Sequence, residues 1–306
     1  MNDRMQHQAR FFAGCQRDNL APARRCGFVA ALTAGFLAIL VGSSTVAAGL
    51  QSSLPMPTRH MALTYEVHAG GLHVFSFDVG LTLDSEGYRI SVVGGTRGIS
   101  SILYKWDVSL KAEGESMRPE RYVSVNTGRQ PTKTMQLDFI EDGSFSVTRN
   151  LPEPVAETAE EAELPTRLPA NIVDPLSAAL VAAQNLATTG HCEQTLPVFD
   201  GKRRFDLTFH DVGSGDLPKS RMAIYQGAAV LCGLTMKRIS GFMKPRRHVG
   251  QWDQDQDEPP TLWIAQVSPD MPPVPVRFTG SISLGSIVVH LTKIESSQEV
   301  ASSAVP

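Results

Sequence analysis

The residue patterns that usually mark catalytic chemistry are missing from this sequence. It contains no Gly-x-Ser-x-Gly motif and no Ser-x-x-Lys pair, which are the common settings of a nucleophilic serine. It also lacks His-Glu-x-x-His and Cys-x-x-Cys, and Gly201-Lys202 has neither the upstream glycine nor the Ser/Thr of a phosphate-binding loop. The sequence therefore predicts no catalytic residue, no metal ligand and no cofactor.

Histidines beyond residue 48 are scattered, and no pair has the spacing of metal ligands. These are His60, His68, His73, His191, His210, His248 and His290. In a strand, His68 and His290 would each stand beside apolar neighbours, but the sequence does not tell whether the two meet. Histidines that are solvated or hydrogen-bonded are one interpretation, and a site assembled by the fold is the other.

Basic residues near two predicted turns could bind an anionic group such as a phosphate or a lipid head group. The residues predicted to bind a ligand are Lys202, Arg203, Arg204, Lys244, Arg246, Arg247 and Trp252. An ordinary hairpin turn after Asp200 would explain the first three equally well. A solvated loop would explain the others, because exposed ion pairs contribute little.

The acidic run that begins at Asp253 starts like a calcium-binding loop and then departs from the pattern. Its sixth position is Glu258 instead of glycine, and its twelfth is Ile264 instead of glutamate. A solvated acidic turn is the prediction, with weak calcium capture as the alternative. Trp106 and Trp263 lie in strand patterns and are expected in the core, which leaves Trp252 as the tryptophan available for stacking.

Residues 1–48 have the three parts of a secretory signal peptide. Five arginines precede an apolar run over 27–41, and Val46-Ala47-Ala48 supplies the small side chains that a signal peptidase requires. The apolar run is shorter than the roughly 20 residues of a membrane-spanning helix, so cleavage before Gly49 is expected, with an uncleaved anchor as the alternative. We therefore expect a periplasmic protein that meets the membrane only transiently, through its signal peptide.

Two cysteines, Cys192 and Cys232, remain after cleavage at this position. A single pair in an oxidising compartment predicts a structural disulfide, and two buried thiols are the alternative. The remaining 258 residues suffice for one large domain, and their net charge of −6 disfavours a nucleic-acid partner.

Alternation of apolar and polar residues with period two predicts many strands. It is clearest where Leu63, Tyr65 and Val67 alternate with polar neighbours. Strands are predicted at 63–67, 75–83, 88–92, 102–110, 122–127, 133–140, 144–148, 205–209, 224–239, 261–267, 274–279 and 286–292. The fold class expected is mainly β: a single curled antiparallel sheet or open β-barrel with one helix, stapled by one disulfide.

The predicted chain organisation follows from breaks in this alternation. A β meander over 49–149 leads into an acidic, proline-rich crossing over 150–173 with five glutamates and four prolines. Asp174-Pro175 then provides a helix cap and a first-turn proline before the Ala/Leu-rich stretch 176–187. The helix and the C-terminal strands occupy 174–294 of the same domain, and 295–306 is expected to be a disordered tail.

The C-terminal half resembles a family of exported proteobacterial proteins catalogued as domain of unknown function 3108. The residues that carry this resemblance are Asp174-Pro175-Leu176-Ser177-Ala178-Ala179-Leu180, Cys192, residues 196–205, Tyr225-Gln226-Gly227 before Cys232, Gly241-Phe242, Ile264-Ala265, Pro275-Val276-Arg277 and residues 285–291. The resemblance implies a β-rich periplasmic protein and assigns no catalytic residue.

Two functions are consistent with these observations. A non-enzymatic periplasmic protein could bind an envelope lipid, glycan or peptide in the hollow of the sheet. The alternative is a hydrolase of envelope polymers whose acid/base pair comes from distant strands, which would require an aspartate and a histidine within hydrogen-bonding distance in a cleft.

Overall fold

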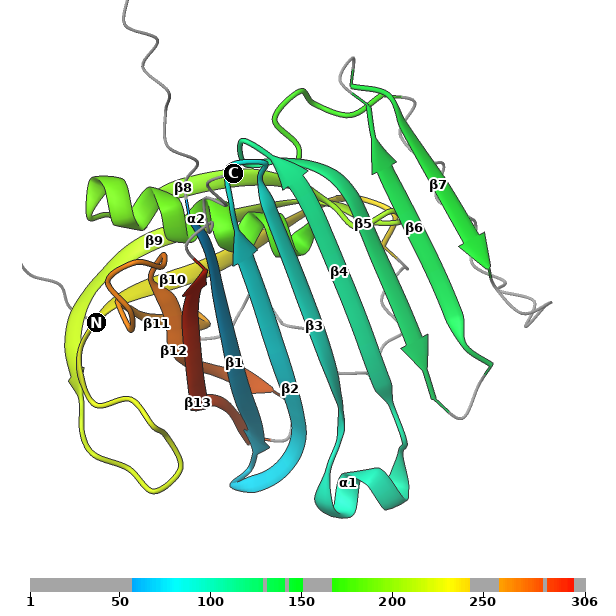
Figure 1. Ribbon diagram of the computed structural model, residues 1–306. Helices are drawn as coiled ribbons and strands as arrows, with labels where there is room; N and C mark the ends of the chain where they lie inside the picture. Colours follow the sequence, from blue (N-terminus) through cyan, green and yellow to red (C-terminus); the bar gives the residue numbers. More distant parts are fainter. Residues whose placement is uncertain are drawn as a thin grey trace, which may run out of the picture. The chain divides into compact units, whose positions relative to one another are not determined.

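All thirteen strands that the computed structural model describes belong to one antiparallel sheet (Figure 1). The structure describes residues 57–128, 131–140, 143–150, 167–242, 259–282 and 285–299. The strands are β1 (Thr58–Ala69), β2 (Leu72–Leu83), β3 (Tyr88–Thr96), β4 (Asp107–Glu115), β5 (Arg118–Thr127), β6 (Lys133–Phe139), β7 (Phe145–Asn150), β8 (Gln194–Phe199), β9 (Arg204–Leu217), β10 (Gly227–Ser240), β11 (Thr261–Ala265), β12 (Val274–Ile282) and β13 (Gly285–Glu299). Their spatial order is β7-β6-β5-β4-β3-β2-β1-β13-β12-β11-β10-β9-β8.

The first and last strands of the chain therefore meet in the middle of the sheet. β1 pairs with β2 on one side and with β13 on the other. Along β1, Met61, Leu63 and Tyr65 are buried and their neighbours are more exposed, which is the predicted period of two. The mainly β fold with a single antiparallel sheet is confirmed.

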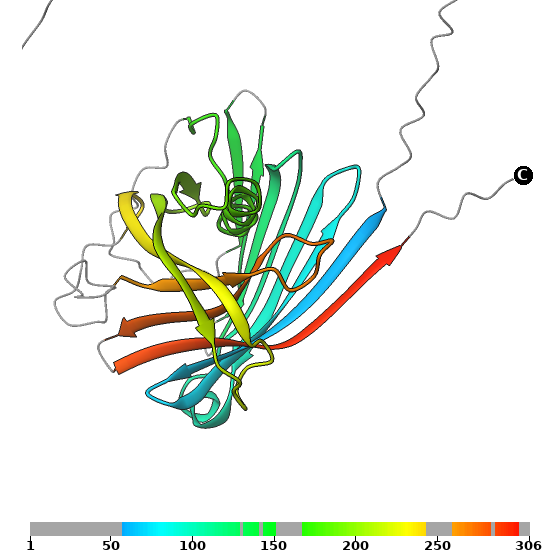
Figure 2. The same ribbon diagram turned by 90° about the vertical axis from the view of Figure 1, so that its left-hand side faces the viewer.

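The sheet curls without closing by backbone hydrogen bonds. In Figure 2 the strands bend around α2 (Pro175–Thr189), and register shifts interrupt several pairs, including β1–β13 and β11–β12. The edge strands β7 and β8 meet through side chains: the rings of Phe145 and Phe199 lie 5.2 Å apart. The sheet is thus an open barrel.

Helix α2 begins as its sequence predicts and extends two residues beyond the predicted stretch, which ended at 187. The Asp174 carboxylate accepts hydrogen bonds from the backbone N–H groups of Leu176 (2.8 Å) and Ser177 (3.0 Å), and Gly190 ends the helix in the left-handed conformation. The Ser177 hydroxyl also lies 2.6 Å from the Tyr88 hydroxyl on β3. Because α2 contacts both β8 and β4, it fills the hollow between the two halves of the sheet.

Replacing Asp174 with alanine should destabilise the protein by about 2–3 kcal/mol, because two backbone N–H groups and the Ser177 hydroxyl lose a buried acceptor. Burial raises the pKa of this fully buried carboxyl group. Asp174→Asn keeps a capping oxygen and removes the cost of burying charge, so it should change stability by less than about 1 kcal/mol. Urea unfolding of both variants measures the difference, and equal losses would contradict the capping role.

Cys192 and Cys232 form the predicted disulfide, with their Cα atoms 5.7 Å apart. Cys192 precedes β8 and Cys232 lies in β10, so the bond connects the end of the helical segment to the sheet across the intervening strand β9. Both cysteines are buried in a cluster with Ala178, Ala182 and Leu186 of α2.

The structure corrects several sequence predictions. The strand predicted at 102–110 is wrong at its start, because α1 (Gly98–Leu103) forms a short helix there and β4 begins at Asp107. Trp106 is 37 % exposed and packs on Phe75, so its expected core position is wrong, whereas Trp263 packs against the core. β13 continues to Glu299, beyond the predicted start of the tail at 295.

The predictions also missed β8, and β10 begins at Gly227 instead of 224. Most of the proline-rich crossing, residues 151–166, lies outside the described residues, as does the signal segment 1–48. No helix within the described ranges is long and apolar enough to cross a bilayer.

Candidate functional site

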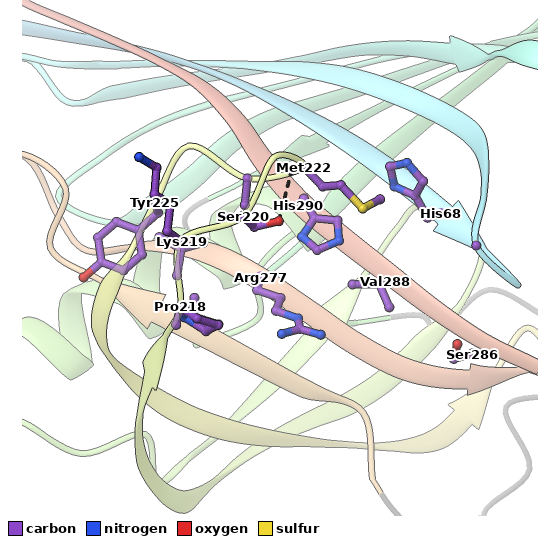
Figure 3. Close-up of a pocket in the computed structure, with 14 residues that line it drawn as sticks. His68, Pro218, Lys219, Ser220, Met222, Tyr225, Arg277, Ser286, Val288 and His290 are labelled. Carbon is purple, nitrogen blue, oxygen red and sulfur yellow. Dashed lines mark hydrogen bonds between the residues drawn. The ribbon is translucent and has the colours of Figure 1, made fainter.

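A pocket of about 450 Å³ lies between the β9–β10 loop, residues 218–226, and the strands β1, β12 and β13 (Figure 3). Polar and apolar groups both line it. The strands contribute His68, Arg277, His290, Val276, Val288 and Ser286, and the loop with its approach contributes Leu217, Pro218, Lys219, Ser220, Met222, Ala223 and Tyr225, with Gly71 at the β1–β2 turn.

Strand register places two pocket residues, His290 and Arg277, in one row with Glu66 and Trp263. Glu66 of β1 lies opposite His290 of β13, and His290 lies opposite Arg277 of β12. Arg277 in turn lies opposite Trp263 of β11, with its guanidinium 5.9 Å from the centre of that ring. Because directly opposite residues in antiparallel strands share a face, four strands bring these side chains together.

His68 joins the row from the same strand as Glu66. Its ring centre lies 5.7 Å from that of His290 and 5.2 Å from that of His73 on β2. The His68 Nε2 atom is 4.0 Å from a Glu66 carboxylate oxygen. His68 thus contacts the rings of both His290 and His73 and lies beside the Glu66 carboxylate.

Three nitrogen atoms of this cluster are buried with no hydrogen-bond partner among the described residues: His68 Nδ1, His290 Nδ1 and Arg277 Nε. His68 itself is only 9 % exposed. Buried polar atoms in folded proteins almost always have partners, so three unpaired nitrogens on residues that line one pocket mark this cluster as the candidate site.

The electrostatic environment of the pocket is positive. Burial lowers the pKa of His290 below its usual value, and the charges of Arg277 and His68 lower it further, while Glu66 opposes this effect. A negatively charged ligand would reverse the shift, because it would stabilise the protonated imidazole.

The β9–β10 loop is fixed over the sheet by a backbone hydrogen bond. The Ile224 N–H donates to the Leu291 carbonyl at 2.9 Å, just beyond the point where β12 and β13 stop pairing. Within the loop, the Met222 N–H donates to the Ser220 hydroxyl at 3.0 Å (Figure 3). This attachment holds Met222 and Tyr225 over the strands that carry Arg277 and His290.

The basic residues predicted to bind a ligand after Asp200 do not line this pocket; they lie at the β8–β9 turn. The Asp200 carboxylate accepts hydrogen bonds from the backbone N–H groups of Lys202 (3.0 Å) and Arg203 (2.6 Å) and pairs with the Arg203 guanidinium at 2.7 Å. Arg204 forms an ion pair with Asp206 at 2.7 Å. These contacts fit a structural turn, and a ligand-binding role for the three basic residues stays a prediction.

The second predicted group lies outside the described residues, since 243–258 contain Lys244, Arg246, Arg247, Trp252 and the calcium-like acidic run. Across the part of the chain that the structure describes, no three His, Cys, Asp or Glu side chains are grouped closely enough to hold a metal ion.

A histidine–aspartate pair exists on the surface. His191 Nδ1 lies 2.9 Å from an Asp211 carboxylate oxygen, and the side chains are 70 % and 36 % exposed. The backbone N–H of Cys192 and His191 both lower the pKa of Asp211. Neither residue lines the pocket, so this pair does not meet the cleft condition that the hydrolase hypothesis set.

Comparison with known proteins adds a family and a distant structural likeness. A family model described as "Protein of unknown function (DUF3108)" matches residues 64–292. A search of curated proteins finds no match. A solved structure from Brucella abortus, described as a beta-barrel-like protein of domain of unknown function DUF1849, is similar with 12 % identity and a TM-score of 0.44, over 78 % of this chain and 97 % of that one.

Proposed function

The chain belongs to the DUF3108 family of proteins of unknown function, and from that premise we propose that it is an exported, non-enzymatic protein of the cell envelope. It binds an amphiphilic envelope component, a lipid in preference to a glycan or peptide, in the pocket beneath the β9–β10 loop. Glycans and peptides are the alternatives that the sequence left open.

One observation carries the proposal: His68, His290 and Arg277, each with a buried nitrogen that has no hydrogen-bond partner among the described residues, line the same pocket as apolar side chains. Val288, Leu217 and Met222 supply the apolar part of the lining. A site with convergent polar groups on one side and apolar surface on the other suits a ligand with a polar end and an apolar body.

Export is supported by the sequence and by the disulfide. The signal-like segment 1–48 precedes the fold, and disulfides persist mainly in oxidising compartments such as the periplasm. The envelope role follows from this location together with a pocket for an amphiphile.

Gene deletion tests the envelope role without knowledge of the ligand. Cells that lack the protein should become more sensitive to detergents and to cell-wall antibiotics, and the full-length chain should restore resistance. A matched chain that lacks residues 1–48 should fail to restore it, because it would stay in the cytoplasm. Full rescue by this shortened chain would contradict export, and unchanged sensitivity of the deletion strain would contradict the envelope role.

A hydrolase remains the second candidate because His73 Nε2 lies 2.8 Å from the Ser76 hydroxyl, beside His68. A nucleophilic serine needs such a base, and usually a third group that orients the base. No carboxylate hydrogen-bonds to His73 within the described part of the chain. Release of a chromophore from activated esters by wild-type protein, but not by Ser76→Ala, would favour this function over binding alone.

A further inference from the structure

Arg277 has no acidic partner in the pocket. It forms no ion pair with any carboxylate among the described residues, and its Nε atom is buried without a hydrogen-bond partner. Its opposite neighbours are His290 and Trp263, and the nearest acidic residue along the row, Glu66, lies beyond His290 and beside His68. Among the residues that the structure describes, no carboxylate neutralises the charge of this guanidinium.

An uncompensated charge in a partly buried site is costly, so a counter-charge there would bind favourably. The guanidinium presents several N–H donors in a planar fork that matches the oxygens of phosphate and carboxylate groups. The imidazoles of His68 and His290, which line the same pocket, add donors when protonated.

We propose that the ligand of this pocket is an amphiphile with an anionic end, either a phosphate or a carboxylate. This inference rests on the proposed function. Arg277, His290 and His68 bind the anionic end, and the apolar body lies along Val288, Leu217 and Met222. Figure 3 shows the polar side chains of the sheet and the loop residues around the same space.

Binding of such an anion should take up protons. The charged and titratable groups that face His290 are Arg277 from β12 and His68 and Glu66 from β1. Burial lowers the pKa of His290, the charges of Arg277 and His68 lower it further, and a bound anion would oppose these effects. Affinity should therefore rise as the pH falls from 8 to 6, by at most tenfold per pH unit for each proton taken up.

The test uses the mature chain and isothermal titration with three probes: dodecyl phosphate, dodecyl maltoside and inorganic phosphate, each amphiphile below its micelle concentration. Wild type should bind dodecyl phosphate at least about tenfold more tightly than dodecyl maltoside. Arg277→Gln should weaken dodecyl phosphate binding by about 10–100-fold and leave dodecyl maltoside binding within about twofold.

Arg118→Gln is the matched control, because Arg118 is exposed on β5 and does not line the pocket. It should bind like wild type. His290→Gln should reduce the pH dependence while keeping part of the affinity, and thermal unfolding of each variant without probe checks its folding.

Each contrary result has its own meaning. If both amphiphiles bound equally and Arg277→Gln had no effect, the claim that the ligand has an anionic end would be contradicted. The proposed function would not be affected. Equally tight binding of inorganic phosphate and dodecyl phosphate would overturn the amphiphile in favour of a free anion. No binding of any probe to folded wild type, together with no phenotype of the deletion strain, would overturn the proposed function itself.

Discussion

Replacing Cys192 and Cys232 together by alanine should lower the free energy of unfolding by about 3–4 kcal/mol. The bond closes a segment with a sequence separation of 40, and loop-closure entropy predicts a loss of this size. Both cysteines are buried beside α2, so the variant also loses packing between the helix and β10. Urea unfolding of the mature chain, followed by circular dichroism, measures the change.

Reduction provides the control for this prediction. A reducing agent should shift the urea midpoint of wild type toward that of the double variant and should leave the double variant unchanged. If the double variant unfolded at the wild-type midpoint, the disulfide would not stabilise the fold. If reducing agent shifted both proteins equally, the shift would come from another source.

Phe199→Ala should destabilise the protein by about 3–5 kcal/mol, which is typical of a large aromatic removed from a core. Phe199 is fully buried, and it belongs to β8, one edge of the sheet. Its ring contacts that of Phe145 on β7, the opposite edge. The substitution therefore removes the contact that brings the two edges together, and chemical denaturation measures its cost.

Tyr104→Ala is the control for loss of an aromatic ring, because Tyr104 is 56 % exposed and should change stability by less than about 0.5 kcal/mol. Equal effects of the two substitutions would contradict the inference that contact between β7 and β8 holds the barrel together. A second contact supports this inference, since the Arg149 guanidinium of β7 donates to the Gly201 carbonyl next to β8 at 2.5 Å.

Local sequence signals predicted those parts of the fold whose causes are local. Asp174 and Pro175 fix the start of α2 through capping and backbone conformation, which involve only neighbouring residues, whereas its end at Gly190 was not predicted. Alternation predicted most strands, because each strand has one buried face. The disulfide was predicted because only two cysteines remain after residue 48 and because the expected compartment is oxidising.

The errors arise where side-chain hydrogen bonds or strand pairing outweigh the local apolar pattern. The alternating residues at 102–106 resemble a strand, but Ser100 and Ser101 donate side-chain hydrogen bonds to the carbonyls of Arg97 and Gly98 and so support a helical turn. The polar end of β13 remains a strand because its whole length pairs with β1, as Glu295 does with Ala62. The pairing of β13 with β1, which lies far away in the sequence, can only be known from the folded structure.

The candidate site could not be assembled from sequence for the same reason. Glu66, His290, Arg277 and Trp263 are far apart in the chain and meet only through the order β1-β13-β12-β11. The sequence pointed to these residues only weakly: His68 and His290 lie in alternating strand patterns, and Arg277 belongs to the segment Pro275-Val276-Arg277. The basic residues that stood out locally, Arg203 and Arg204, form ion pairs in a turn instead.

The most direct test of the ligand pocket is native mass spectrometry of the mature protein purified from its own cells. Wild type should carry a bound species with a mass of a few hundred daltons or more, whereas Val288→Trp should carry none, because the indole would fill the pocket. Val93→Trp, at a 55 % exposed position on β3, should retain the species. Bare wild-type protein, or equal occupancy in wild type and folded Val288→Trp, would contradict the assignment of this pocket as the binding site.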